Sequence, residues 1–120
     1  MQSLFLDKKT NTISIIDIDP EKRNDVKKYL ECDNWDAPLH RIGQVQYRIL
    51  VDDNSWPLDD ILNSDELISV MSSQGSPVMY GNLLFFRYDG MKLTELMEED
   101  VKNITKHTVT LPRTGLVVVI

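Results

Sequence analysis

Cysteine is almost absent from this sequence, since Cys32 is the one cysteine among 120 residues. A single thiol excludes a disulfide within the chain and any zinc site built from several cysteines. No stretch approaches the roughly 20 apolar residues that a membrane span needs, and no apolar leader follows the first methionine. The length suits one domain, because domains of about 100–150 residues are the commonest. We therefore expect a single cytoplasmic domain over residues 1–120, without a membrane partner.

Basic residues are missing from the middle of the chain. Residues 49–86 contain no Lys or Arg, although the whole chain has 13 of them against 19 acids and a net charge of −6. Outside this segment acids and bases balance, so the excess negative charge belongs to residues 52–66. Direct nucleic-acid binding needs the opposite pattern, a basic stripe that releases counterions from phosphates. We therefore expect no direct nucleic-acid partner, and instead a host protein with a basic surface.

Residues 52–66 also contain a tryptophan, a residue type that is enriched in interface hot spots. Clustered carboxylates next to such a ring can compete for a protein surface that normally holds phosphates. The simpler interpretation is that Trp35 and Trp56 each close one end of a sheet. The predicted partner-binding residues are Asp52, Asp53, Trp56, Asp59, Asp60, Asp65 and Glu66.

Catalytic motifs are lacking as well. The chain has no P-loop, no glycine-rich dinucleotide motif, no G-x-S-x-G and no H-E-x-x-H. Asp17 and Asp19 could hold Mg²⁺ together with a phosphate, but the simpler interpretation is that Asp19 caps a helix and Asp17 faces water. Cys32 and His40 could form a nucleophile pair, yet no third orienting group is identifiable. We expect no enzymatic activity, no cofactor and no metal.

Hydrophobic spacing and turn residues divide the chain into helices and strands. Asp19 and Pro20 mark a helix start, and Thr94 is a candidate cap for a later helix whose buried side would include Met97. Gly81 marks a bulge or a close backbone approach within one long strand. The predicted elements are a hairpin at 2–18, a helix at 20–31, strands within 39–51, a helical segment at 57–71, a strand at 78–88, a helix at 94–106 and a strand at 115–120.

The last five residues, 116–120, are all apolar and contain no proline. Such a run would aggregate as an exposed edge strand, so it must pair within its own sheet or across a homodimer. Together the elements predict a single α+β domain with a mainly antiparallel sheet of five or six strands. Two or three helices are expected to pack on one face of that sheet.

A second functional hypothesis is small-molecule or nucleotide binding. Aromatic rings and a guanidinium beside a half-covered sheet could stack on and hold a nucleobase. The candidate ligand-binding residues are Trp35, Tyr47 and Arg48. A protein of this kind would act as a sponge for a signalling nucleotide.

Three segments resemble those of an uncharacterised domain family of small accessory proteins from phages, plasmids and conjugative elements. The similarity covers roughly residues 1–105 and lies in the hairpin of residues 4–18, in residues 81–86 and in residues 96–100. Met97 departs from the pattern, because the family has a capping Thr or Ser there. The family has no established catalytic residues. The resemblance implies an accessory protein of a mobile element that counters host defence. The acid-only segment, the two tryptophans and the small acidic chain lead to the hypothesis of a protein without catalysis that binds and modulates or inhibits a host protein, such as a defence-system nuclease.

Overall fold

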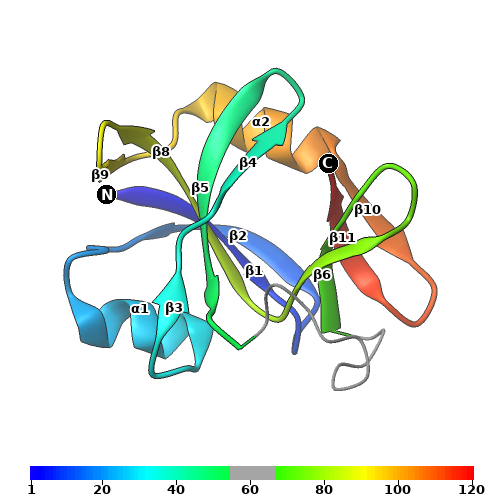
Figure 1. Ribbon diagram of the computed structural model, residues 1–120, viewed down its shortest axis with the longest axis horizontal. Helices are drawn as coiled ribbons and strands as arrows, with labels where there is room; N and C mark the ends of the chain where they lie inside the picture. The colour runs from blue at the N-terminus through cyan, green and yellow to red at the C-terminus, as the bar shows by residue number, and fades with distance from the viewer. Residues whose placement is uncertain (55–66) are drawn as a thin grey trace.

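The computed structural model describes residues 1–54 and 67–120, and over these residues the chain forms two helices and eleven strands in two sheets (Figure 1). The predicted α+β class is confirmed. The sheets contain more strands than the five or six expected. The elements are β1 (Gln2–Asp7), β2 (Thr12–Asp17), α1 (Arg23–Leu30), β3 (Trp35–Asp36), β4 (Leu39–Ile42), β5 (Val45–Asp52), β6 (Ile68–Met71), β7 (Pro77–Tyr80), β8 (Leu83–Asp89), β9 (Lys92–Thr94), α2 (Glu98–Lys106), β10 (Thr108–Leu111) and β11 (Gly115–Val119).

The larger sheet has seven antiparallel strands. Its main order is β2-β1-β8-β5-β3, with β4 added to β5 and β9 added to β8. Side chains alternate across a strand, so Leu83 and Phe85 of β8 enter one core while Leu84 and Phe86 enter another. All four are fully buried. The central strand β8 is therefore covered on both faces.

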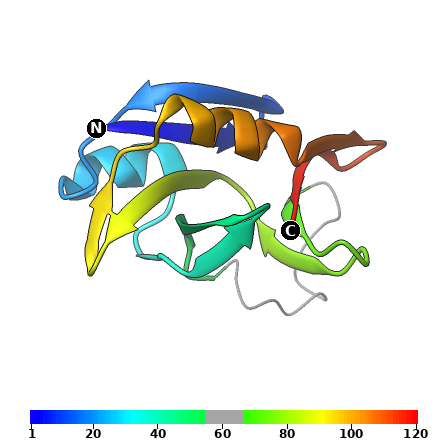
Figure 2. The same ribbon diagram turned by 90° about the horizontal axis from the view of Figure 1, so that it is seen from above.

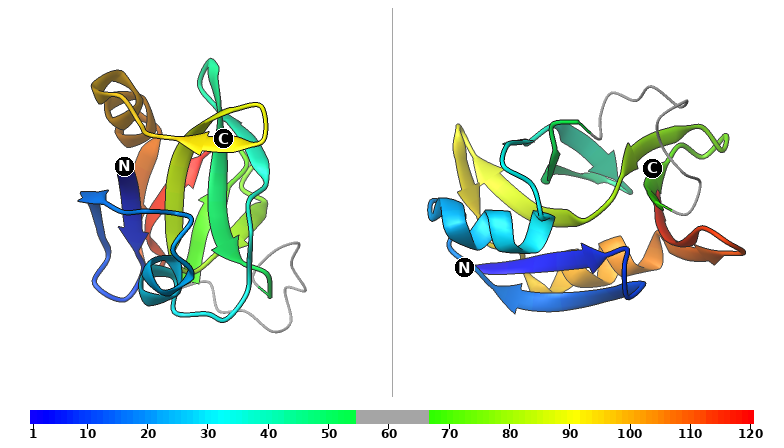
Figure 3. Two further views of the ribbon diagram at one scale, coloured as in Figure 1. Left: turned by 90° about the vertical axis from the view of Figure 1, so that its left-hand side faces the viewer. Right: turned by 90° about the horizontal axis from the view of Figure 1, so that it is seen from below.

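The two helices cover opposite faces of this sheet, which corrects the expectation that they share one face. Val26 and Leu30 of α1 pack in the core that contains Phe86, whereas Ile104 of α2 packs in the core that contains Phe85. In the left view of Figure 3, α1 lies at the bottom and α2 at the top left. The reason is the uninterrupted apolar run of β8, which leaves hydrophobic side chains to cover on both sides.

The smaller sheet has the order β10-β11-β6-β7, and β11 runs parallel to β6 (Figure 1, right). The apolar C-terminal run is thus an interior strand, with β10 on one side and β6 on the other. The sequence left two alternatives for this run, pairing within its own sheet or across a homodimer, and in the structure it pairs within its own sheet. Lys8 and Asn11 tie this sheet to the β1–β2 turn: the Lys8 ammonium donates to the carbonyls of Thr114 and Leu116 at 2.6 and 2.7 Å, and Asn11 Oδ1 accepts from the Leu116 amide.

The helix expected at 57–71 is wrong for its last residues, because Ile68–Met71 form strand β6. The spacing of Leu67, Ile68 and Met71 fits a helix, but pairing with β7 and β11 makes this segment extended. The first part of the expected helix lies outside the described residues. The strand expected at 78–88 is two strands in different sheets, and Gly81 separates them with a φ of +81°.

Both helices begin later than the sequence predicted. Lys22 is the N-cap of α1, and Asp19 instead accepts a hydrogen bond from the Glu21 amide. Met97 is the N-cap of α2, while Thr94 belongs to β9. Met97 is also 54% exposed rather than buried. Before α1 a turn occupies residues 20–21, and before α2 strand β9 ends at Thr94 and is followed by three residues without regular structure.

Candidate functional site

The tryptophan of β3 lies among four aspartates that come from two separate parts of the chain. Asp33 and Asp36 flank Trp35 in sequence, and Asp52 of β5 is its direct partner across the strand pair. The Asp53 amide donates to the Asn34 carbonyl at 3.2 Å, which brings the turn after β5 against the loop before β3. We call Asp33, Trp35, Asp36, Asp52 and Asp53 the Trp35 acidic surface. Trp35 and Asp52 are half-buried, and the other three residues are exposed.

Electrostatic repulsion is concentrated at the β5 end of this surface. The pKa of Asp53 is raised by desolvation and by the charges of Asp52 and Asp36. Asp33 is the exception, since a hydrogen-bonded ion pair with Lys27 at 2.7 Å lowers its pKa. Negative charge at Asp52 and Asp53 is therefore less well compensated than at Asp33.

A basic side chain covers the ring of Trp35. The Arg23 guanidinium lies 4.8 Å from the ring centroid, a cation–π distance. The same guanidinium donates to the Asp33 carbonyl and to Asn34 Oδ1. Because Arg23 is the first residue of α1, this contact joins the start of the helix to the loop that carries the acids.

The sequence identified part of this surface. Asp52 and Asp53 were among the predicted partner-binding residues, and the structure places Asp33 and Asp36 close to them. The signal for the second pair was the acids on either side of Trp35, but only the β3–β5 pairing joins the two segments. The remaining predicted partner-binding residues lie outside the described residues: Trp56, Asp59, Asp60, Asp65 and Glu66.

The structure does not bring the three candidate ligand-binding residues together. Tyr47 is fully buried and belongs to the core beneath α2. Trp35 packs in the other core, on the α1 side of the sheet, and strand alternation places Arg48 on that side too. Arg48 stacks 5.4 Å from the ring of Tyr88 and donates to the Ala37 carbonyl at 2.8 Å.

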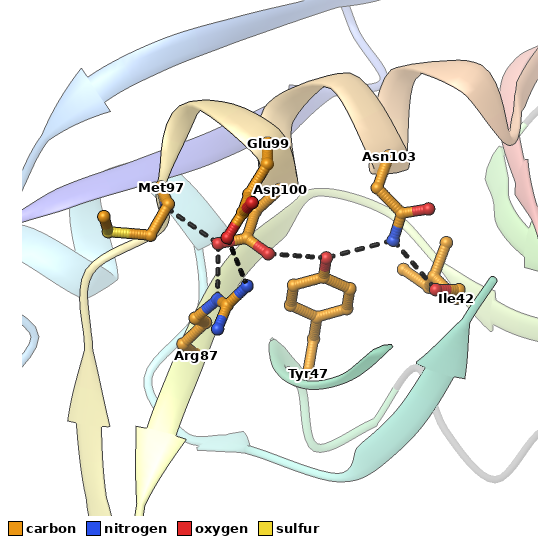
Figure 4. Close-up of polar contacts among 7 residues, drawn as sticks. All are labelled: Ile42, Tyr47, Arg87, Met97, Glu99, Asp100 and Asn103. Atoms are coloured by element: carbon orange, nitrogen blue, oxygen red, sulfur yellow. Dashed lines mark hydrogen bonds and ion pairs between the residues drawn. The ribbon is translucent and has the colours of Figure 1, made fainter. Parts of the chain in front are cut away.

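A network of polar side chains connects α2 to the large sheet (Figure 4). Asp100 is 1% exposed and accepts three hydrogen bonds. Arg87 Nε and the Met97 amide donate to its Oδ2 at 2.5 and 2.8 Å, and the Tyr47 hydroxyl donates to its Oδ1 at 2.8 Å. We call Tyr47, Arg87, Asp100 and Asn103 the Asp100 network. These three hydrogen bonds compensate the buried charge of Asp100.

The other half of the Asp100 network reaches the β4–β5 turn. Asn103 donates to the Tyr47 hydroxyl at 3.0 Å and to the Ile42 carbonyl at 2.9 Å. Gly43 follows with a φ of +63°, and a Cβ there would lie 2.7 Å from Asn103 Oδ1 and 3.0 Å from His107 Cε1. The glycine thus permits the close approach of the turn to the end of α2.

Protonation states in the Asp100 network follow from burial and hydrogen bonding. Burial alone would raise the pKa of Asp100, but the hydrogen bonds from Arg87, Met97 and Tyr47 together lower it. Burial raises the pKa of Tyr47 to about 12. At neutral pH the network therefore contains an ionised carboxylate and a neutral phenol.

Two chemical options from the sequence can be assessed directly. Burial, together with Asp52, Asp53 and Asp33, raises the pKa of Cys32 to about 11, so its thiol is protonated at neutral pH and is a poor nucleophile. Within residues 1–54 and 67–120, no group of three or more His, Cys, Asp or Glu is arranged to bind a metal ion. In the same residues, neither helix is long and apolar enough to cross a membrane.

No model of a known protein family matches the chain, and neither a curated protein nor a solved structure matches it. The resemblance to accessory proteins of mobile elements therefore stays an expectation from the sequence.

Proposed function

We propose that this chain is a binding protein without catalysis, and that its Trp35 acidic surface docks onto a basic surface of a partner protein. The observation that supports this most directly is the convergence of Asp36, Asp52 and Asp53 beside a half-buried tryptophan, where desolvation and the charges of Asp52 and Asp36 raise the pKa of Asp53. Carboxylates that repel one another in the free protein gain from a cationic neighbour. A partner that supplies Lys or Arg there would relieve the repulsion.

The composition of the surface fits protein recognition. Tryptophan anchors interface hot spots, and Trp35 keeps part of its surface accessible while its ring is fixed by Arg23. Fixed rings lose little conformational entropy on binding. Charges around such an anchor increase the association rate and exclude partners of the same sign.

The partner class that we favour is a host protein whose basic surface normally holds nucleic acid, such as a nuclease of a defence system. This choice is supported by the acidic surface, which has the sign of charge of a phosphate backbone, and it agrees with the expected likeness to accessory proteins of mobile elements. The chain would then act as an inhibitor that occupies part of the nucleic-acid site. Its net charge of −6 is modest, which favours a local contact over mimicry of a long duplex.

The test is affinity capture from a bacterial host lysate with two matched double variants. Asp52→Asn with Asp53→Asn removes two charges from the Trp35 acidic surface and preserves side-chain shape. Glu21→Asn with Asp89→Asn removes the same charge from exposed positions elsewhere. We expect the wild type and the control to retain a basic protein that heparin releases, and the Asp52/Asp53 variant to lose it.

Equal retention by both double variants would contradict the proposal, as would a captured protein that heparin does not release. Thermal unfolding of each variant separates loss of binding from loss of fold. All four substitutions are at exposed or half-buried sites, so we expect both double variants to fold.

A further inference from the structure

Within residues 1–54 and 67–120, the outer edge of β2 is an unpaired strand edge. β2 pairs with β1 along six residues, and no segment among the described residues pairs with its other side. In Figure 2 it forms the upper margin of the molecule. An edge of this kind presents unpaired backbone N–H and C=O groups to solvent.

The other edge strands of the described residues are shorter or carry features that block pairing. β3 has two residues and includes Asp36, and β9 has three and includes Lys92. β4 contains Arg41, and β7 begins with Pro77. β10 is followed by a proline and an arginine. Charges and prolines are common protection against edge-to-edge association, whereas β2 is six residues long, has no Pro, Lys or Arg, and carries its one acid, Asp17, at its last position.

The register of the hairpin fixes which backbone groups of β2 point outward. The Ile18 amide donates to the Met1 carbonyl at 2.9 Å, so this pair is hydrogen-bonded. Hydrogen-bonded and non-hydrogen-bonded pairs alternate along an antiparallel ladder, and the register of β1 with β2 has no irregularity. The amides and carbonyls of Ile13, Ile15 and Asp17 therefore face the free edge.

We propose that a second copy of this chain pairs with β2 through this edge, antiparallel and two-fold symmetric, with Ile15 opposite the same residue of the other copy. This register places Ile13 of one copy opposite Asp17 of the other. All the outward backbone groups of both strands then meet partners. A register shifted by one residue would pair outward groups with inward ones and lose these bonds.

The side chains favour a second copy as the occupant. Ile15 is 56% exposed and lies beside Val101 of α2 in a shallow depression whose rim is the Glu98–Lys102 ion pair. Two-fold pairing covers each isoleucine with its counterpart, and an isologous contact needs no other partner. The acids of the Trp35 acidic surface lie at β3, at the opposite end of the strand order, so they add little repulsion at this contact.

Two variants of the full chain test the dimer. Ile15→Lys places like charges directly opposite each other across the two-fold axis, and Val109→Lys puts the same residue on exposed β10. Light scattering coupled to size exclusion, over a wide range of protein concentration, should give twice the mass of one chain for the wild type and for Val109→Lys. We expect Ile15→Lys to raise the dissociation constant of the dimer by about tenfold, equivalent to 1.4 kcal/mol.

The register has its own test. In a Cys32→Ser background, Ile15→Cys places two thiols on opposite residues, within the Cα separation that a disulfide tolerates. Mild oxidation should give a covalent dimer of Ile15→Cys and leave Val109→Cys without a covalent cross-link. A wild type that is monomeric at every concentration would overturn the proposal, and so would equal cross-linking at both positions.

Discussion

The Asp100 network and the Trp35 acidic surface treat carboxylates in opposite ways. Asp100 is buried, accepts three hydrogen bonds and has a lowered pKa. Asp53 is exposed among other acids and has a raised pKa. The first carboxylate is stabilised by the folded chain, while the second is disfavoured by it.

The difference shows that the fold provides polar partners for its buried carboxylate and not for its exposed ones. A buried charge is tolerated only with a full set of partners, and the Asp100 network provides them from α2, β5 and β8. An exposed charge needs no partner for folding, because water solvates it. Repulsion that persists at the surface is thus available for binding, which is the basis of the proposed function.

Removal of the Asp100 carboxylate should have the largest effect. Asp100→Ala leaves the Tyr47 hydroxyl buried without its acceptor and Arg87 without its main partner. Loss of one partner from a buried charge pair costs about 3–5 kcal/mol, and we expect about 3 kcal/mol because Arg87 is partly exposed. The free energy of unfolding in urea measures it. Glu99→Gln is the control, since Glu99 also contacts Arg87 but is exposed and should cost well under about 1 kcal/mol.

A change in the turn that faces the Asp100 network should have a smaller effect. Gly43→Ala combines a φ of +63° with a Cβ 2.7 Å from Asn103 Oδ1, and we expect a loss of about 2 kcal/mol. Gly90→Ala has a similar φ of +61° but no atom within 4 Å of its Cβ, so only the backbone strain of about 1 kcal/mol remains. Thermal unfolding should rank the two variants in this order. Equal losses would show that Asn103 and His107 move aside freely.

The effects of pH should differ in sign between the two regions, and the effect at Asp53 should be the smallest of all. A lowered pKa means that Asp100 stabilises the fold above its unfolded pKa of about 3.9, and that this stability is lost as pH falls through its folded pKa. A raised pKa means that ionised Asp53 disfavours the fold, and that acid removes the penalty. Asp100→Asn should therefore be less stable than wild type at neutral pH, and Asp53→Asn slightly more stable.

The Asp53 difference should shrink first as the pH falls, because the pKa of Asp53 is raised, whereas the Asp100 difference should shrink only below about 3.9, as the pH falls towards the lowered folded pKa of Asp100. Urea titrations at several pH values provide the measurement. If Asp100→Asn and Asp53→Asn changed the free energy of unfolding in the same direction at neutral pH, the contrast between the two regions would be wrong. High salt should reduce the Asp53 difference more, because exposed charges are screened more than buried ones.

The Asp100 network was not predicted from the sequence, although a signal for it exists. Glu98, Glu99 and Asp100 all look like acids in the first turn of a helix. Asp100, however, stands midway between Leu96 and Ile104 at four-residue spacing, which places it on the buried face. An acid on that face requires partners, but those partners come from β5 and β8, and their arrival depends on strand order.

Local patterns were sufficient for the elements whose structure is decided by their own residues. The hairpin of β1 and β2 has alternating apolar residues and a polar turn, and both features can be recognised from the sequence alone. β6 shows the opposite case, because four residues with Ile68, Val70 and Met71 satisfy either periodicity. Pairing with β11, almost fifty residues later, determined its conformation. The β3–β5 pairing that assembles the Trp35 acidic surface is likewise tertiary.

The interior position of β11 has a consequence for the order in which the chain can fold. β6 and β7 are synthesised long before β11. One edge of β6 therefore has no strand to pair with until β11 has been made. β1 waits similarly for β8, since Leu4 pairs with Phe85. Such distant pairings slow folding compared with helical domains. One edge of the apolar strand β6 therefore lacks its neighbour until the last residues of the chain have been made.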